Sequence, residues 1–253
     1  MSEAFDRAVA FQREFERRRA ETAIRSTHGT AYLSPTLPKV YDRNVFLVDL
    51  GAKASAEELV AEAAWAFLMH DLAHRKIAID DELATAVDAE FRDAGWQVEK
   101  LVVMPHARPA TPVETSAVEE VAADVLVPVW ESRMRRDIAD AETIAQLIEA
   151  QRGRADALDV RYFATRFGGR IASYCELFSD GRTGQIESVM TEEEFRNRGL
   201  GTAVVAGALA ASRAVHDFTF IVADANDWPK ELYRKLGFEP AGTVHRFLLR
   251  PEN

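Results

Sequence analysis

The sequence of 253 residues contains one cysteine, Cys175, and no run of 18 apolar residues. A single thiol cannot form an internal disulfide, which agrees with a reducing compartment. The missing apolar run argues against a transmembrane helix, and the charged, helix-like N-terminal segment is unlike a signal peptide. We therefore expect a cytoplasmic protein with no membrane partner.

Basic residues are in deficit, since 31 Lys and Arg face 41 Asp and Glu and the net charge is −10. No basic stripe runs along the chain, which argues against nucleic-acid binding. Arg13 and the arginines at 17–19 alternate with Glu14 and Glu16, as expected of a solvated helix face. An acidic protein repels anions, so a site for an anionic cofactor must supply its own positive field.

Several common ligand motifs are absent. The chain has neither Gly-x-x-x-x-Gly-Lys-Ser/Thr nor Gly-x-Gly-x-x-Gly. His70 and His74 are four residues apart, a spacing that could form half of a metal site on a helix. No third ligand is apparent, and the Glu of His-Glu-x-x-His is missing. We expect no metal and interpret both histidines as partly buried or surface side chains.

The most informative stretch is Arg196-Asn197-Arg198-Gly199-Leu200-Gly201, followed by the small-residue run 202–209. A glycine-rich turn that opens a helix leaves several backbone N–H groups unpaired, and the helix dipole adds positive potential there. The glycines allow unusual φ values and close approach of a ligand. The loop is therefore a candidate phosphate site to which two arginines add positive charge.

This Arg-x-x-Gly-x-Gly loop resembles that of the GNAT superfamily of acyl-CoA-dependent N-acyltransferases. A second signature of that family resembles the stretch 226–238, where Asn226 precedes Tyr233 by seven residues and Leu236-Gly237-Phe238 follows. The resemblance implies acetyl-CoA as co-substrate and no metal. It implies that the loop, with Thr202, holds the pyrophosphate of the cofactor.

The resemblance also implies roles for residues outside the loop. The strand before it, at Val189, Met190 and Thr191, would bind pantetheine through its backbone, and a backbone N–H there, for which we favour Met190, would polarise the thioester oxygen. Asn226 would contact CoA, and Tyr233 would protonate the departing sulfur. The chain departs from the common pattern at Thr191 and Glu193, where Val and Pro are frequent.

The general base is less well determined. Glu187 lies on the strand that leads to the cofactor site and shares a face with Gln185 and Val189 by strand periodicity. Glu176 and Asp224 are competitors, and Glu187 could instead pair with an arginine or with the substrate ammonium. Trp130, Phe195 and Trp228 could line an acceptor pocket or pack in the core.

The pattern of elements predicts two domains and an α/β (α+β) fold. The resemblance covers about 115–253 and implies a catalytic GNAT domain with a mixed, mostly antiparallel sheet flanked by helices. Residues 1–110 repeat part of that order as a degenerate GNAT-like domain, whose turn at 51–55 lacks the loop motif and should hold no cofactor. The expected helices are 3–25, 55–69, 81–94, 124–136, 139–151, 199–213 and 228–236, the expected strands are 44–50, 75–79, 98–104, 116–122, 159–167, 170–178, 183–191, 218–223 and 243–249, and 29–39 is a loop.

These features predict an N-acetyltransferase that uses direct attack in a ternary complex, with a small-molecule or peptide amine as acceptor. One alternative is a tandem acyltransferase for a small thiol-precursor amine. Another, of a different class, is a catalytically silent acyl-CoA sensor or interaction module. The resemblance also allows a homodimer.

Overall fold

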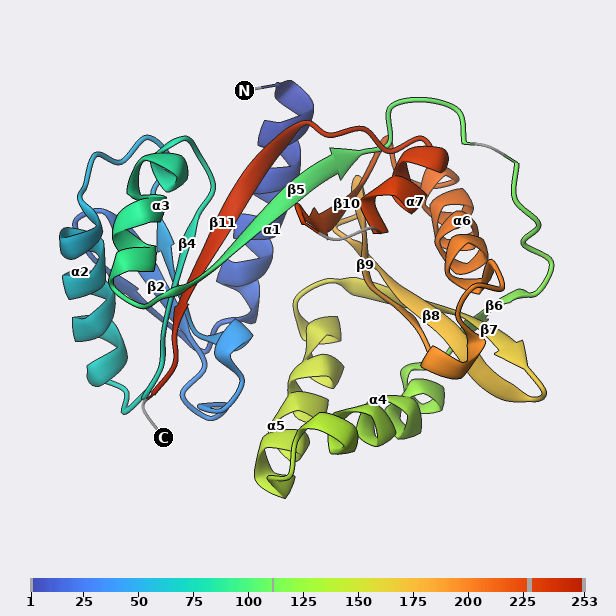
Figure 1. The fold of residues 1–253 in the computed structure, drawn as a ribbon, viewed down its shortest axis with the longest axis horizontal. Coiled ribbons are helices and arrows are strands. Elements are labelled where there is room, and N and C mark those ends of the chain that lie inside the picture. Colours follow the sequence, from blue (N-terminus) through green and yellow to red (C-terminus); the bar gives the residue numbers. More distant parts are fainter. Residues whose placement is uncertain (1, 111, 227–228, 252–253) are drawn as a thin grey trace. The chain divides into compact units, whose positions relative to one another are not determined.

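A computed structural model describes residues 2–110, 112–226 and 229–251 (Figure 1). The chain forms two compact units that interleave along the sequence. We call residues 12–102, 224–226 and 242–253 the N-terminal unit, and residues 1–11, 103–223 and 227–241 the C-terminal unit. The domain division expected between 110 and 115 stays a prediction.

The N-terminal unit is built on a mixed sheet in the order β1-β2-β3-β4-β11-β5. Strand β3 runs parallel to β4, and the pairs β1–β2, β2–β3 and β4–β11 are antiparallel. The last strand of the chain therefore lies in register with β4, with His245 opposite Ile79. The strands are β1 (Thr22–Arg25), β2 (Gly29–Leu33), β3 (Val45–Val48), β4 (Arg75–Ile79), β5 (Gln97–Pro105) and β11 (Gly242–Leu249).

Helices α2 (Ala56–Leu68) and α3 (Leu83–Asp93) bury their apolar faces against this sheet. Phe91 stacks on Phe247 of β11 with ring centroids 4.2 Å apart, and both side chains are fully buried. Burial of aromatic rings such as these stabilises the core. A short 3-10 turn, η1 (Tyr41–Arg43), precedes β3.

The first helix is shorter than expected. Helix α1 spans Glu3–Arg19, so the helix predicted over 3–25 is wrong beyond Arg19, and the loop predicted over 29–39 is wrong at its start. Residues 22–25 and 29–33 instead form the hairpin β1–β2. Gly29 permits this, because a Cβ there would lie 2.6 Å from the Leu47 carbonyl oxygen of β3. Tertiary pairing overrides the local charge pattern that suggested a longer helix.

The C-terminal unit has the strand order β10-β9-β8-β7-β6. All pairs are antiparallel except β9 with β10, which is parallel. The strands are β6 (Val118–Val121), β7 (Asp159–Phe167), β8 (Arg170–Ser179), β9 (Thr183–Thr191) and β10 (Phe218–Asp224), and the helices are α4 (Ala123–Asp137), α5 (Ala141–Arg152), η2 (Gly153–Asp156), η3 (Glu193–Phe195), α6 (Leu200–Arg213) and α7 (Pro229–Lys235).

The two faces of this sheet carry different helices, as neighbouring residues of β8 show. Cys175 contacts the Val204 carbonyl of α6 through its Sγ atom at 3.6 Å. Glu176 points to the opposite face, where it meets Arg154 of η2. Figure 1 shows α6 on one side of β7–β9 and the α4–α5 pair on the other. The candidate base Glu187 thus lies on a strand of a sheet that has helices on both faces.

The expected fold class is confirmed, since the chain has mixed sheets, mostly antiparallel and flanked by helices. Apart from the first helix and the loop after it, the expected helices and strands agree with the observed ones to within a few residues. Residue 228, where the last expected helix begins, lies outside the described residues. None of the helices in the described ranges combines the length and apolar character that a bilayer crossing requires.

Candidate functional site

The loop at 196–201 leads the chain from η3 into helix α6. Asn197 and Gly199 both adopt the left-handed backbone conformation, with φ of 62° and 76°. Turns of this kind direct successive N–H groups to one side and form a concavity suited to an anion. Gly199 is the N-cap residue and provides no side-chain acceptor for the first N–H groups of α6. These donors therefore remain available at the positive end of the helix dipole.

The two glycines of the loop serve different purposes. A Cβ on Gly199 would meet no atom within 4 Å, so this position needs glycine for its backbone angle alone. A Cβ on Gly201 would lie 2.9 Å from Oγ1 of Thr191. Gly201 therefore lets α6 approach the end of β9 closely, which places the open helix terminus beside that strand.

The corresponding turn of the N-terminal unit, at 51–55, is closed by its own side chains. Ser55 caps α2 by accepting the Glu58 N–H, and the Glu58 carboxylate accepts the Ser55 N–H at 2.8 Å. The N–H of Gly51 donates to Asp81 Oδ2 at 2.6 Å. A capping box of this kind satisfies the donors that α6 leaves open. The two helix termini are therefore chemically different.

The arginines of the loop are exposed. The Arg198 guanidinium lies 4.6 Å from the centroid of the Phe167 ring, and Nε of Arg196 approaches the Thr191 carbonyl oxygen at 3.5 Å. Within the described part of the chain neither guanidinium has a carboxylate partner. Both charges can thus act on an anion bound at the loop, which an acidic protein requires.

Strand β9 separates from β10 partway along its length. The parallel register runs from Thr183 opposite Phe218 to Ile186 opposite Ile221, while β9 stays paired with β8 as far as Thr191. Its residues change from buried to half-buried at Glu187, and Ser188 takes a left-handed φ of 54° within a register shift. The β9 edge beyond this bulge can therefore accept another extended chain.

The pairing with β8 decides which amides face that edge. The Glu192 N–H donates to the Ala172 carbonyl at 2.9 Å, and bonded and non-bonded pairs alternate in antiparallel strands. Tyr174 and Met190 lie two positions along the strands from Ala172 and Glu192 and are therefore also a hydrogen-bonded pair. The N–H of Met190 thus faces β8. The N–H groups of Val189 and Thr191 face the open edge. This pairing favours them over Met190 for a contact with the thioester oxygen.

A row of titratable side chains crosses three strands and ends at the bulge. Tyr162 lies opposite Glu176, and Glu176 lies opposite Glu187, so the three share one face of the sheet. Nε2 of Gln185 donates to Glu187 Oε2 at 2.5 Å, and the Ser188 N–H donates to Glu187 Oε1 at 3.1 Å. Gln185 and Glu187 share a face as expected.

Arg154 of η2 ties this row to the bulge. Its Nη1 donates to Glu176 Oε2 at 2.5 Å and to Ser188 Oγ at 3.2 Å. Glu176 is only 1% exposed; burial raises the pKa of its carboxyl, Arg154 opposes the rise and the charge of Glu187 adds to it. Burial also raises the pKa of Tyr162 to about 12. Arg154 thus neutralises a buried carboxylate and also holds the bulged strand.

The sequence alone did not indicate Arg154 or Ser188. Arg154 lies among several charged residues after a helix and carries no motif. A left-handed serine inside a strand is a conformation that sequence rarely reveals, because tertiary packing has to hold it. The only available signal was the polar pair Glu187-Ser188 between the apolar residues Ile186 and Val189.

Tyr233 and Asn226 flank the segment 227–228, which is outside the described residues. Tyr233 lies on α7, is 6% exposed and packs edge-on to Phe238 with centroids 6.4 Å apart. Gly237 ends that helix with φ of 88°, and a Cβ there would lie 2.1 Å from the Arg108 carbonyl oxygen. Asn226 is exposed, and its N–H donates to Asp224 Oδ1 at 2.7 Å. Their roles in binding and proton transfer stay predictions.

Other candidates from the sequence are structural. Trp130 and Phe195 are buried in the core, and Trp228 lies outside the described residues. Cys175 is fully buried, which raises the pKa of its thiol, so it is unsuited to act as a nucleophile.

The histidine pair does not form a metal half-site. Helix α2 ends at Leu68, before His70, and His74 is buried against Tyr41 with ring centroids 4.1 Å apart. Burial lowers the pKa of His74 to about 4. Among the described residues, no group of three His, Cys, Asp or Glu side chains could hold a metal ion.

Comparison with known proteins bears on this site. Residues 125–238 match the model of the acetyltransferase (GNAT) family. No curated protein matches the chain in sequence. The matched range contains the loop, the bulged strand and Tyr233.

Solved structures resemble the chain over most of its length. A conserved protein of unknown function from Staphylococcus epidermidis is 14% identical, with 90% of this chain and 93% of that chain covered and a TM-score of 0.69. A GCN5-related N-acetyltransferase from Kribbella flavida is 16% identical, with 100% and 97% covered and a TM-score of 0.63. A tandem GNAT protein from the clavulanic acid biosynthesis pathway is 15% identical, with 91% and 83% covered and a TM-score of 0.55. At these identities the likeness shows a shared fold.

Proposed function

We propose that the chain is an acyl-CoA-dependent N-acyltransferase, because residues 125–238 match the model of the acetyltransferase (GNAT) family. It transfers acetyl from acetyl-CoA to a primary amine by direct attack in a ternary complex. Residues 115–253 form its catalytic domain, and residues 1–110 form a degenerate GNAT-like domain. The acceptor is a small molecule or a peptide.

The uncapped N-terminus of α6 carries this proposal. Its donors, the left-handed turn at Asn197 and Gly199 and two exposed arginines suit a diphosphate. The turn before α2 also has a left-handed glycine, Gly51 with φ of 76°, but the terminus of α2 is closed by a capping box. The open edge of β9 suits the amides of pantetheine, which pair like an added strand. The proposed CoA contacts are Val189, Met190, Thr191, Arg196, Asn197, Arg198, Gly199, Leu200, Gly201, Thr202 and Asn226.

The chemistry requires one bond to form and one to break. The amine nitrogen forms a bond to the acyl carbon, the carbon–sulfur bond breaks, and charge develops on the acyl oxygen. A backbone N–H of Val189 or Thr191 stabilises that charge. Glu187 accepts the proton of the amine, directly or through water, and Tyr233 gives a proton to the departing sulfur. The protein thus supplies a donor, an acceptor and an oxyanion contact.

Glu187 is favoured over its competitors by position. It lies at the start of the open edge and is half-buried, so an acceptor can reach it. Glu176 is buried and already holds Arg154, and Asp224 Oδ1 accepts the Asn226 N–H. We therefore assign the base to Glu187.

The test is release of free thiol from acetyl-CoA in the presence of a panel of primary amines. An acyltransferase releases thiol only when amine is present. A silent sensor, the alternative of another class, binds CoA and is stabilised by it but releases no thiol. Tyr233→Phe should lower kcat and change the pH dependence of kcat at basic pH, whereas the affinity for CoA should stay the same. An unchanged rate and pH profile would remove Tyr233 from the mechanism.

A further inference from the structure

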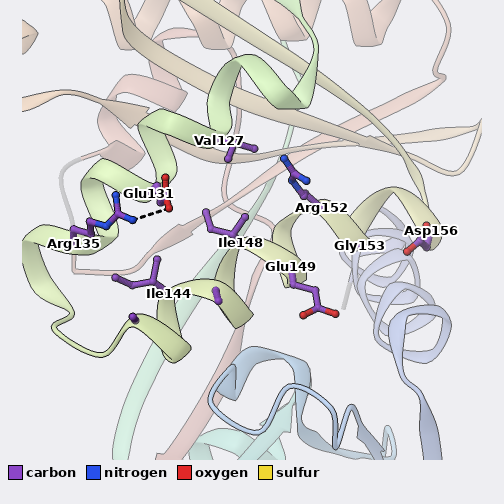
Figure 2. Close-up of a pocket in the computed structure, with 11 residues that line it drawn as sticks. Val127, Glu131, Arg135, Ile144, Ile148, Glu149, Arg152, Gly153 and Asp156 are labelled. Atoms are coloured by element: carbon purple, nitrogen blue, oxygen red, sulfur yellow. Dashed lines mark hydrogen bonds and ion pairs between the residues drawn. The ribbon is translucent and has the colours of Figure 1, made fainter.

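A cavity lies between helices α4 and α5 of the C-terminal unit (Figure 2). Its volume is about 670 Å³, within the range of small-molecule sites. Its floor is apolar, with Val127 from α4 and Ile144 and Ile148 from α5. Ala141 and Ala145 complete the α5 wall, and their small side chains leave the space between the helices open.

Some of the charged side chains around this cavity form ion pairs and others do not. At one end Arg135 pairs with Glu131 at 2.8 Å. Arg152 lies beside Glu149 toward the other end (Figure 2) and pairs with Asp124 at 3.0 Å. At that other end Glu149 and Asp156 are exposed, and neither carboxylate has an ion-pair or hydrogen-bond partner in the part of the chain that the structure describes. With its cations already paired, the cavity presents two free carboxylates beside an apolar floor. This combination complements a cation with an apolar body.

The carboxylate end of the cavity is close to the candidate catalytic strand. Gly153 and Asp156 of the η2 turn line the cavity. Arg154, between them, donates to Ser188 in the β9 bulge and to Glu176. One arginine side chain therefore spans from the wall of the cavity to the residue next to Glu187 and Val189.

We propose that the α4–α5 cavity binds the acceptor, and that the acceptor is a primary amine with an apolar body. This inference rests on the proposed function and narrows its substrate class. The apolar body lies on Val127, Ile144 and Ile148, and the ammonium is drawn toward Glu149 and Asp156. At that end it is next to the turn that holds the bulged strand.

The probes are 4-phenylbutylamine, methylamine and the neutral 4-phenylbutanol, titrated by calorimetry into the full chain with CoA present. 4-Phenylbutylamine should bind at least about tenfold more tightly than methylamine, because only it buries apolar area. It should bind more tightly than 4-phenylbutanol, because only it carries a charge for the carboxylates. Equal affinity for all three probes would overturn the proposal.

Ala145→Phe should fill the cavity without disturbing the fold, since Ala145 is exposed on a helix. The variant should bind 4-phenylbutylamine at least about tenfold more weakly than the parent does. The matched control, Ala210→Phe, changes an exposed alanine near the end of α6 and should leave affinity as it is. Glu149→Gln with Asp156→Asn should remove the preference for the amine over the alcohol, whereas Glu57→Gln on α2 should keep it. Unchanged binding in Ala145→Phe contradicts the proposal.

Turnover separates this inference from the proposed function. If Ala145→Phe raises KM for 4-phenylbutylamine but leaves KM for acetyl-CoA and kcat with methylamine unchanged, the cavity is the acceptor site. If the amine binds in the cavity and no amine gives thiol release, the proposed function fails and with it the acceptor role. If thiol release occurs but Ala145→Phe changes KM for none of the amines, the proposed acyltransferase function is kept and the assignment of the cavity as the acceptor site is wrong.

Discussion

At the scale of single residues, the loop of α6 can be tested through one backbone angle. Gly199→Val forces a branched side chain into φ of 76°, and its Cβ meets no atom within 4 Å, so we expect a mainly conformational cost of about 1–2 kcal/mol. We expect CoA affinity to fall at least about tenfold, because the turn that aims its N–H groups relaxes. Calorimetry measures the affinity and urea unfolding measures the stability.

A second glycine provides the control for that experiment. Gly181, in the turn between β8 and β9, has φ of 89°, and a Cβ there would likewise meet no atom within 4 Å. Gly181→Val should lose similar stability while CoA affinity stays unchanged. Equal affinity loss in both variants would mean that strain, and not the loop, controls binding.

Arg154 allows a prediction about pH. Burial already raises the pKa of Glu176, and Arg154→Met removes the cation that opposes the rise. A carboxyl with a raised folded-state pKa binds protons more tightly when folded, so stability falls as pH rises above its ordinary value of 4.5. The variant should resemble the parent near pH 4.5 and unfold more easily by about 3–5 kcal/mol at pH 8. Urea unfolding at both pH values measures this.

The matched double variant, Arg154→Met with Glu176→Gln, removes the buried charge together with its partner. The additional pH dependence that Arg154→Met introduces should be absent from the double variant, which keeps only the slope given by other titrating groups such as His74. If the additional slope persists in the double variant, a group other than Glu176 is responsible.

The residues of the site differ in how far the sequence could reveal them. The loop was predictable because glycine spacing and arginine charge are local features. Which backbone N–H groups of β9 face its open edge was not predictable. It depends on the pairing register with β8, which shifts at the left-handed Ser188. Arg154 reaches the site only through the folded sheet, and its partner Glu176 is 22 positions away. Long-range pairing of this kind leaves no local pattern.

At the scale of elements, helices α2 and α6 begin in opposite ways. Ser55 and Glu58 form a capping box on α2, whereas α6 begins without a side-chain cap. Ser55→Ala should lower the unfolding free energy by about 1 kcal/mol and leave CoA affinity unchanged, because the turn at 51–55 is not the proposed binding site. Urea unfolding and calorimetry on the same sample measure both. A loss of CoA affinity would place cofactor in the N-terminal unit.

Most elements could be predicted from sequence periodicity, and the exception is informative. The segment 22–25 lies beyond a helix rich in charged pairs, yet it forms a strand because β2 offers it a full antiparallel register. Gly29 lets β2 approach β3, and no sequence pattern within 3–25 indicates that approach. Edge strands made by tertiary pairing are therefore the part of this fold that periodicity misses.

At the scale of the whole molecule, the chain order does not match the two compact units. Residues 242–253 come last in sequence, but β11 pairs with β4 of the N-terminal unit, and Phe247 is buried there with Phe91. The C-terminal unit likewise includes residues 1–11, where Phe11 meets Phe220 with centroids 5.6 Å apart. Each unit thus depends on a segment from the opposite end of the sequence.

This exchange predicts which region opens when a core ring is lost. Phe247→Ala should cost about 3–5 kcal/mol and speed hydrogen exchange in β4 and α3, although these elements are far from residue 247 in sequence. Phe220→Ala, an equally buried ring, is the reciprocal control and should speed exchange in β9 first. Mass-spectrometric hydrogen exchange on both variants measures the pattern. If each variant opened both units equally, they would fold as one cooperative body and the division into two units would have no thermodynamic meaning.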